Sequence, residues 1–232
     1  MLESLIEKWK LRLLFLAFAL WCHQPIGFAQ APGADSNSAA EGVALLKQLL
    51  QESLDRLRTY EWTETTVVRQ KGDEKARRLS RCHYRIDGKV QREVMSLAKP
   101  EKKKEEVSDY IERAITLVRY YAPPDLSEIQ RIHNLGRTSI LAIEPGKRMT
   151  VEFRDYRFQG DKLDVEIDLG EKRLSSLHVS SPLGEARDPV TLEVRFGVLP
   201  DGTAYPSEGI LDAKAKKLTV TVRNSEYRKQ SS

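Results

Sequence analysis

Alternating apolar and polar residues mark the C-terminal part of the chain, from Asp188 to Tyr227, as antiparallel sheet. Two segments there alternate with a period of two, so one face of each predicted strand is apolar and the other polar. The apolar positions are Val190, Leu192, Val194, Phe196, Val198, Leu218, Val220 and Val222. Between the segments, Leu199-Pro200-Asp201-Gly202 predicts a type I turn, because proline fixes φ and glycine accepts the left-handed position that follows.

The same alternation recurs upstream and predicts about ten strands in all, at the spacing typical of a barrel or sandwich. The further strands are expected at residues 60–68, at a segment ending at 82–86, and at 89–97, 140–143, 149–153, 163–169 and 174–181. Asp87-Gly88 and Gly160-Asp161 predict tight hairpins. Pro206 and Gly209 predict an edge or a bulge, because proline cannot donate to a sheet ladder.

Three segments have the spacing of amphipathic helices instead. The first is expected from Gly42, with an apolar stripe that needs a sheet face to cover. That stripe consists of Val43, Leu46, Leu49, Leu50, Leu54 and Leu57. Residues 107–121 repeat apolar side chains every three or four positions without a lapse. Asp125, with Glu128 three residues later, predicts a capping box for a short third helix that ends at Gly136.

The first 31 residues have the layout of a secretory signal peptide. Basic residues precede the apolar run 13–21, and Ala29-Gln30-Ala31 supplies small residues before a cut. The run is shorter than the roughly 20 residues that span a bilayer. We therefore expect a cleaved signal peptide at residues 1–31, a flexible leader at 32–41 and a single domain at 42–232. A retained anchor is the alternative.

Composition removes several classes of function. The chain is 31% charged but has a formal net charge of only +4, too balanced to indicate a nucleic-acid surface. Cys82 is the single cysteine after the signal segment, so no internal disulfide is expected. Its alternation with Tyr84 and Ile86 predicts a buried, inert thiol. Arginines crowd the second and third strands, where a solvated outer face is favoured over an anion site. They are Arg77, Arg78, Arg81, Arg85 and Arg92.

Catalytic motifs are missing from the sequence. No histidine has a second ligand at metal-binding spacing, and neither a Gly-x-Ser-x-Gly motif nor a glycine-rich phosphate loop occurs. His178 with Ser180 or Ser181 and Asp188 is a conceivable triad, but alternation places these residues on a strand surface and a loop. We expect no enzyme, no catalytic residue, no metal and no cofactor.

The order of helix, three strands, two helices and a long antiparallel run resembles the periplasmic lipoprotein-carrier superfamily. That superfamily includes the outer-membrane lipoprotein carrier and receptor (LolA and LolB) and the RseB-type stress sensor. The resemblance rests on the signal segment, on Thr59-Tyr60-Glu61-Trp62 after the first helix, on the Asp87-Gly88 hairpin, on the middle helices and on residues 199–206. It implies an incomplete barrel that holds acyl chains in an apolar cavity. The sequence is also similar to uncharacterised secreted bacterial proteins, which leaves the ligand open.

These observations together predict an α+β fold, a curved and mainly antiparallel sheet wrapped around an N-terminal helix and two mid-chain helices. We expect a monomeric, periplasmic or secreted protein that binds a hydrophobic ligand, a lipid or a lipidated protein, without nucleic acid and without a membrane span after signal cleavage. Residues 104–135 would form a helical lid. The candidate cavity-lining residues are Trp62, Ile111, Ile115, Val165, Ile167, Val194 and Phe196. The alternatives are an envelope module that binds protein through the sheet edge near Pro206 and, third, a hydrolase.

Overall fold

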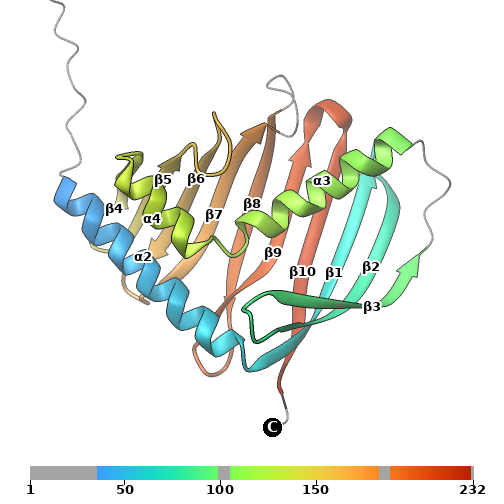
Figure 1. Cartoon of the computed structure of the whole chain (residues 1–232), viewed down its shortest axis with the longest axis horizontal. Helices are drawn as coiled ribbons and strands as arrows, with labels where there is room; N and C mark the ends of the chain where they lie inside the picture. The colour runs from blue at the N-terminus through green and yellow to red at the C-terminus, as the bar shows by residue number, and fades with distance from the viewer. Residues whose placement is uncertain (1–35, 99–104, 183–188, 231–232) are drawn as a thin grey trace, which may run out of the picture. The chain divides into compact units, whose positions relative to one another are not determined.

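Ten antiparallel strands form one continuous sheet, which runs from β4 on the left of Figure 1 to β3 on the right. The computed structural model describes residues 36–98, 105–182 and 189–230, which belong to one compact unit. The strands are β1 (Tyr60–Gln70), β2 (Asp73–Tyr84), β3 (Val90–Ala98), β4 (Thr138–Glu144), β5 (Arg148–Arg154), β6 (Lys162–Asp168), β7 (Arg173–Pro182), β8 (Pro189–Val198), β9 (Ala204–Ala213) and β10 (Leu218–Lys229). Their order is β3-β2-β1-β10-β9-β8-β7-β6-β5-β4, so the sheet keeps two edges and is an incomplete barrel.

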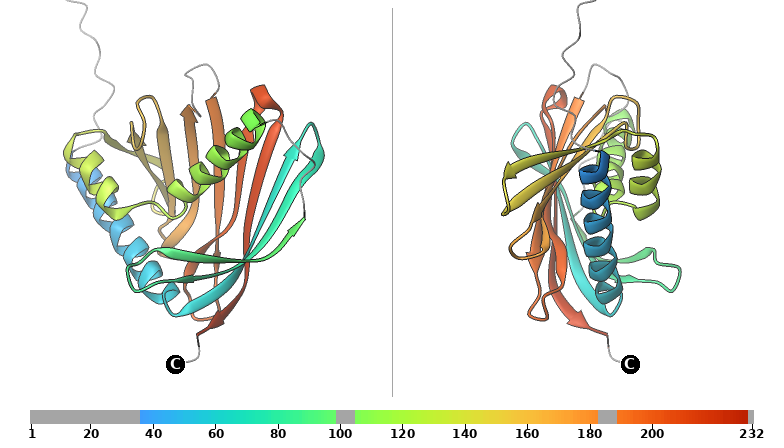
Figure 2. Two further views of the ribbon diagram at one scale, coloured as in Figure 1. Left: turned by 45° about the vertical axis from the view of Figure 1, so that its right-hand side comes forward. Right: turned by 90° about the vertical axis from the view of Figure 1, so that its left-hand side faces the viewer.

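Three helices cover one face of this sheet. They are α2 (Ser36–Leu57), α3 (Glu105–Tyr121) and α4 (Leu126–Asn134), and a short 3-10 turn spans Lys214–Lys216. α2 packs against α4 and several strands, whereas α3 lies against β9 and β10. The side view in Figure 2 shows the helices on the concave side, toward which the β2–β3 hairpin also curls. The predicted α+β half-barrel is confirmed. No helix among the described residues is long and apolar enough to cross a membrane.

The core lies between the helices and the concave face because most apolar positions of the alternating strands point there. Along β6 the burial pattern alternates strictly, with Val165 and Ile167 fully buried. On α3 the apolar stripe meets this face, and on α2 Leu46 and Leu50 do the same. Burying such side chains contributes about 1.5–3 kcal/mol each, which is how short strands and isolated helices hold together.

The first helix begins earlier than expected. α2 begins at Ser36, so residues 36–41, predicted as part of a flexible leader, belong to the helix, and Ala39 is buried. Position 42 lies inside the helix, and a glycine is required there because α2 approaches β4 closely at this point. A Cβ on Gly42 would lie 2.5 Å from Cδ1 of Ile140. The glycine therefore marks a packing contact and not the start of the helix.

The turns are partly as predicted. Gly202 donates from its backbone N–H to the Leu199 carbonyl at 2.9 Å, which confirms that turn, and Gly88 closes the β2–β3 hairpin by donating to the Arg85 carbonyl at 2.9 Å. The predicted two-residue hairpin at Gly160-Asp161 is wrong. Residues 155–161 form a longer loop, in which the Asp161 carboxylate turns inward and accepts the backbone N–H groups of residues 157 and 158.

Pro206 and Gly209 lie in β9, in the interior of the sheet, so the predicted edge is wrong and the alternative, a bulge, is confirmed. The pairing of β8 with β9 shifts between Arg195 and Phe196, which pair with Glu208 and Pro206. β9 is hydrogen-bonded to β8 on one side and β10 on the other. A protein-binding surface on an open edge near Pro206 is therefore excluded.

The helices α3 and α4 are fixed by polar contacts in addition to apolar packing. The Tyr121 hydroxyl at the end of α3 donates to the buried Asp161 carboxylate. Asp125 caps α4 by accepting the N–H groups of Ser127 and Glu128 at 2.8 and 3.1 Å. The reciprocal bond of a capping box is replaced, because the Asp125 N–H donates to the Tyr156 hydroxyl at 2.9 Å. Asp125 is thus an N-cap, as predicted, within a different network.

Candidate functional site: a pocket between the third helix and the sheet

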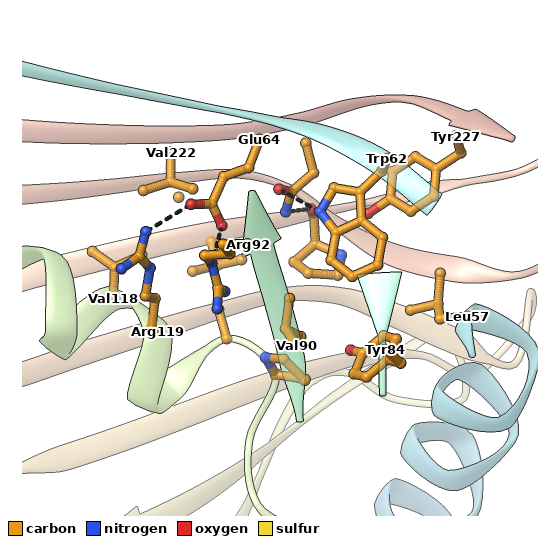
Figure 3. A pocket seen from close by; sticks show the side chains of 16 residues that line it. Leu57, Trp62, Glu64, Tyr84, Val90, Arg92, Val118, Arg119, Val222 and Tyr227 are labelled. Carbon is orange, nitrogen blue, oxygen red and sulfur yellow. Dashed lines mark hydrogen bonds and ion pairs between the residues drawn. The ribbon is translucent and has the colours of Figure 1, made fainter. Parts of the chain in front are cut away.

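A pocket opens on the concave face where the C-terminal end of α3 meets the β1–β3 half of the sheet (Figure 3). Its lining residues come from α2, from α3 and the segment after it, and from six strands, and they are mostly apolar or aromatic. They are Leu57, Trp62, Glu64, Tyr84, Val90, Arg92, Val118, Arg119, Ala122, Pro123, Val194, Pro206, Gly209, Val222, Asn224 and Tyr227. Its volume is about 40 Å³. At roughly 10–15 Å³ for each water, it holds a few water molecules and no acyl chain.

One wall of the pocket is a cluster of aromatic rings. Trp62 stacks on Tyr227 with 5.6 Å between ring centroids and packs on Tyr84 at 5.4 Å. The stacking follows from a bulge, because the register of β1 and β10 shifts between Glu61 and Thr63. Glu226 on the bulged strand has a φ of 55°. The extra residue turns Tyr227 onto the indole, so that the rings pack together into one apolar wall.

Trp62 offers this surface without an unpaired donor. Its Nε1–H donates to the Asn224 side-chain oxygen at 3.1 Å, and the Asn224 amide donates to the Pro206 carbonyl at 2.8 Å. Both polar groups of Asn224 are thereby used, and the indole presents its carbon face to the pocket. An apolar chain could lie on it without losing a hydrogen bond.

Next to the aromatic wall, a buried carboxylate binds two arginines. Glu64 of β1 has a 3% exposed side chain and accepts from Nε of Arg92 on β3 at 2.9 Å and from Nη2 of Arg119 on α3 at 2.8 Å. Burial raises the pKa of the Glu64 carboxyl, but the two guanidinium groups lower it by more, so its pKa lies below the ordinary value. The carboxyl is therefore ionised at neutral pH, and the triad has a net charge of +1.

Two of the arginines expected on a solvated outer face lie on the concave face. In the register, Arg92 pairs with Cys82 and Arg78 pairs with Thr66, both on the face that carries Trp62 and Glu64. Arg77 and Arg81 have the opposite parity and are exposed, as predicted. The solvated-face prediction is thus wrong for Arg78 and Arg92. The overlooked signal was Glu64, a charged residue at an apolar-face position of its strand.

The predicted lining residues divide between the pocket and the core. Trp62 and Val194 line the pocket. Ile111, Ile115, Val165 and Ile167 belong to the buried core, and Phe196 packs against it, half-buried. In this structure these five contact other protein groups, so their role as a ligand-lining set stays a prediction. Arg92, Arg119 and the tyrosines are pocket residues that the sequence alone did not single out.

The remaining chemical candidates do not form a reactive site. Cys82 is fully buried, as predicted, although Ile86 lies in the hairpin turn and is exposed. Burial and the nearby Glu64 charge raise the pKa of the Cys82 thiol to about 12, which suppresses the nucleophilic thiolate. His178 is exposed, Ser181 is buried, and Asp188 lies outside the described residues. Within residues 36–98, 105–182 and 189–230, no cluster of ligating side chains is placed to hold a metal.

Comparisons with known proteins give distant likenesses. No protein-family model matches the chain, and a search of curated proteins finds no significant relative. A DUF1329 family protein from Desulfovibrio piger is 9% identical, with 83% of this chain and 93% of that chain covered and a TM-score of 0.45.

Two further solved structures are similar to this chain at comparably low sequence identity. A LolA superfamily protein from Nitrosomonas europaea is 12% identical, with 80% and 94% of the two chains covered and a TM-score of 0.37. A putative outer membrane lipoprotein-sorting protein domain from Vibrio parahaemolyticus is 12% identical, with coverage of 80% and 92% and a TM-score of 0.40. The predicted resemblance to the lipoprotein-carrier superfamily is confirmed as a resemblance. Because all three TM-scores are below 0.5, we base the function on the residues of this chain.

Proposed function

We propose that this domain binds an apolar chain, from a lipid or a lipidated protein, between α3 and the concave face of the sheet. The observation that supports this most directly is the aromatic and apolar pocket at the end of α3, on the inner side of a sheet that does not close. The protein would act as a carrier or sensor in the bacterial envelope, without catalysis. A pocket of about 40 Å³ must enlarge to admit a chain.

Enlargement requires movement of α3, because its buried side chains occupy the concave face beside the pocket. Each methylene group that leaves water contributes about 0.8 kcal/mol, so a chain of about ten carbons contributes roughly 8 kcal/mol. The free energy needed to displace α3 is subtracted from these roughly 8 kcal/mol. The expected dissociation constants are therefore in the micromolar range or weaker. Such affinities suit a protein that must release its ligand.

We also propose that the chain is exported. The layout of residues 1–31 supports this, although that segment lies outside the described residues. When the full chain is expressed in a bacterium, the mature protein should begin at or near Pro32 and be recovered from the periplasm or the medium. N-terminal sequencing of the purified protein checks this. Recovery of a chain with Met1 intact in the membrane fraction would instead support the retained anchor.

Locking α3 to the sheet should block uptake of an apolar probe. A Cβ built on Gly209 of β9 lies 3.3 Å from Cγ1 of Val118 on α3, so Val118→Cys with Gly209→Cys can form a disulfide across this contact. We expect the reduced double variant to bind N-phenyl-1-naphthylamine, with a rise in its fluorescence, and the oxidised form to bind at least about tenfold more weakly because α3 cannot move.

The reduced form of the same variant is the matched control, since it carries both substitutions. Wild type treated with the same oxidant controls for Cys82. Equal binding by the oxidised and reduced forms would show that α3 is not a lid. If the native protein takes up no probe and co-purifies with no lipid detectable by mass spectrometry, the proposal is wrong.

Absence of both probe uptake and bound lipid would favour the alternative, a protein-binding module. One feature of the structure supports this alternative. β3 pairs only with β2 and is therefore an edge strand, and its Val94 and Met95 are exposed. An edge with apolar side chains can accept a further strand from a partner. Val94→Lys with Met95→Lys should then abolish co-purification of a partner.

A further inference from the structure

The pocket has more positive than negative charge. Of the described residues that line it, Glu64 alone carries a carboxylate, whereas Arg92 and Arg119 each carry a guanidinium group. Both arginine side chains are about a quarter exposed, at 27% and 26%, so their charges are partly removed from water. Figure 3 shows the two guanidinium groups on either side of the Glu64 carboxylate, next to the aromatic wall. An uncompensated positive charge at the mouth of an apolar pocket is costly unless an anion joins it.

Buried arginine donors near this site have no partner. The Nε–H of Arg119 is buried and, among the described residues, makes no hydrogen bond, and the same holds for Nη2 of Arg78. Arg78 lies on the same face of β2, two positions from Ser80, which pairs with Glu64 in the register. Buried donors in folded proteins are nearly always paired. These guanidinium donors beside a net positive pocket therefore have the capacity to bind a further acceptor beyond the described residues.

We propose that the ligand is an anionic amphiphile whose oxyanion head group binds Arg119 and Arg92 while its apolar chain lies on Trp62, Tyr84 and Tyr227. This inference rests on the proposed function and adds the chemical class of the head group. A carboxylate or phosphate fits because the planar guanidinium fork donates two parallel hydrogen bonds to such oxygens. Glu64 accepts hydrogen bonds from both guanidinium groups and would compete with the head group for them.

Paired probes that differ only in charge test the proposal. The full chain should bind 11-(dansylamino)undecanoic acid about tenfold or more tightly than the methyl ester of the same acid, the effect of one charged hydrogen bond. Arg119→Gln should reduce this ratio to near one, because the acid loses its guanidinium partner. Glu64→Gln should raise the ratio above that of wild type, because the competing carboxylate is gone.

Arg113→Gln is the matched control, since Arg113 is an exposed arginine on the same helix. It should leave the acid-to-ester ratio of wild type unchanged. Competition by butyrate and by decanoate, which share a carboxylate and differ in chain length, distinguishes a combined head-group and chain site from a general anion site. If butyrate displaces the long-chain acid only at concentrations far above those of decanoate, the chain and the head group bind together, as proposed.

The possible failures are distinguishable. Equal binding of acid and ester by wild type would overturn the anionic head group and leave the apolar site intact. An unchanged ratio in Arg119→Gln would likewise overturn the role of Arg119, because a triad that only stabilises the fold would not distinguish acid from ester. Absence of binding by both probes and by N-phenyl-1-naphthylamine would contradict the proposed function itself.

Discussion

Val194→Asp should destabilise the domain by at least about 4 kcal/mol, a large part of the ~5–15 kcal/mol that stabilises a typical domain. Val194 is fully buried in β8, where it lies between Leu177 and Gly209 in the register. Neither neighbour can pair with a charge, so the new carboxylate would lose its hydration without compensation. The free energy of unfolding from urea titrations, followed by far-UV circular dichroism, measures the effect.

Val198→Asp is the control within the same strand. Val198 is the last residue of β8 and is 46% exposed, so a charge there stays in water and should change the stability by less than about 0.5 kcal/mol. A folded Val194→Asp variant with near wild-type stability would show that the pocket is already hydrated at this wall. Because unfolding is expected, this substitution tests the core and not ligand binding.

Glu64→Gln should destabilise the domain by about 2–3 kcal/mol at pH 7. Gln keeps the shape of the side chain but leaves the guanidinium groups of Arg92 and Arg119 without their charged partner, and breaking a buried ion pair costs about 3–5 kcal/mol when all groups are fully buried. The partial exposure of both arginines reduces this value. Urea denaturation of both proteins at pH 7 provides the comparison.

The same ion triad predicts how the stability depends on pH. The pKa of Glu64 in the folded protein is below its ordinary value of 4.5, so its contribution is complete above that value and is lost as the pH falls through the lower, folded pKa. The stability difference between wild type and Glu64→Gln should therefore shrink below about pH 4.5. Glu74→Gln is a suitable control, since Glu74 pairs with Arg77 on the exposed surface. A difference that stays constant down to pH 2 would show that the charge of Glu64 does not stabilise the fold.

The sequence predicts the elements well because their signals are local. α3 repeats its apolar residues with the helical period, β6 and β8 alternate without interruption, and Pro200 and Gly202 define their turn with four consecutive residues. Interruptions in these patterns were harder to interpret. The sequence predicts a helix start at Gly42, whereas in the structure Gly42 lies inside α2 in close contact with Ile140, a residue almost a hundred positions away.

The candidate site was mostly beyond prediction for the same reason. Glu64, Arg92 and Arg119 come from β1, β3 and α3, and only the curl of the sheet and the docking of α3 bring them together. The hairpin turn alone places Arg92 opposite Cys82, because the bulge between Leu79 and Ser80 lies beyond this pair, so the informative signal for its face is strand parity and not charge patterning. Trp62 and Val194 were identified because each lies on the apolar face of a regularly alternating strand.

The place of β10 in the sheet has a consequence for the biogenesis of the protein. β10 is the last strand in the chain and lies between β1 and β9, with Tyr60 opposite Lys229. Until Leu218–Lys229 has been synthesised, β3-β2-β1 and the remaining strands are two separate ribbons, and joining them closes a loop of nearly the whole domain. Such long-range pairing makes folding slow and late. A nascent chain of this topology therefore stays without its complete sheet until β10 has been synthesised.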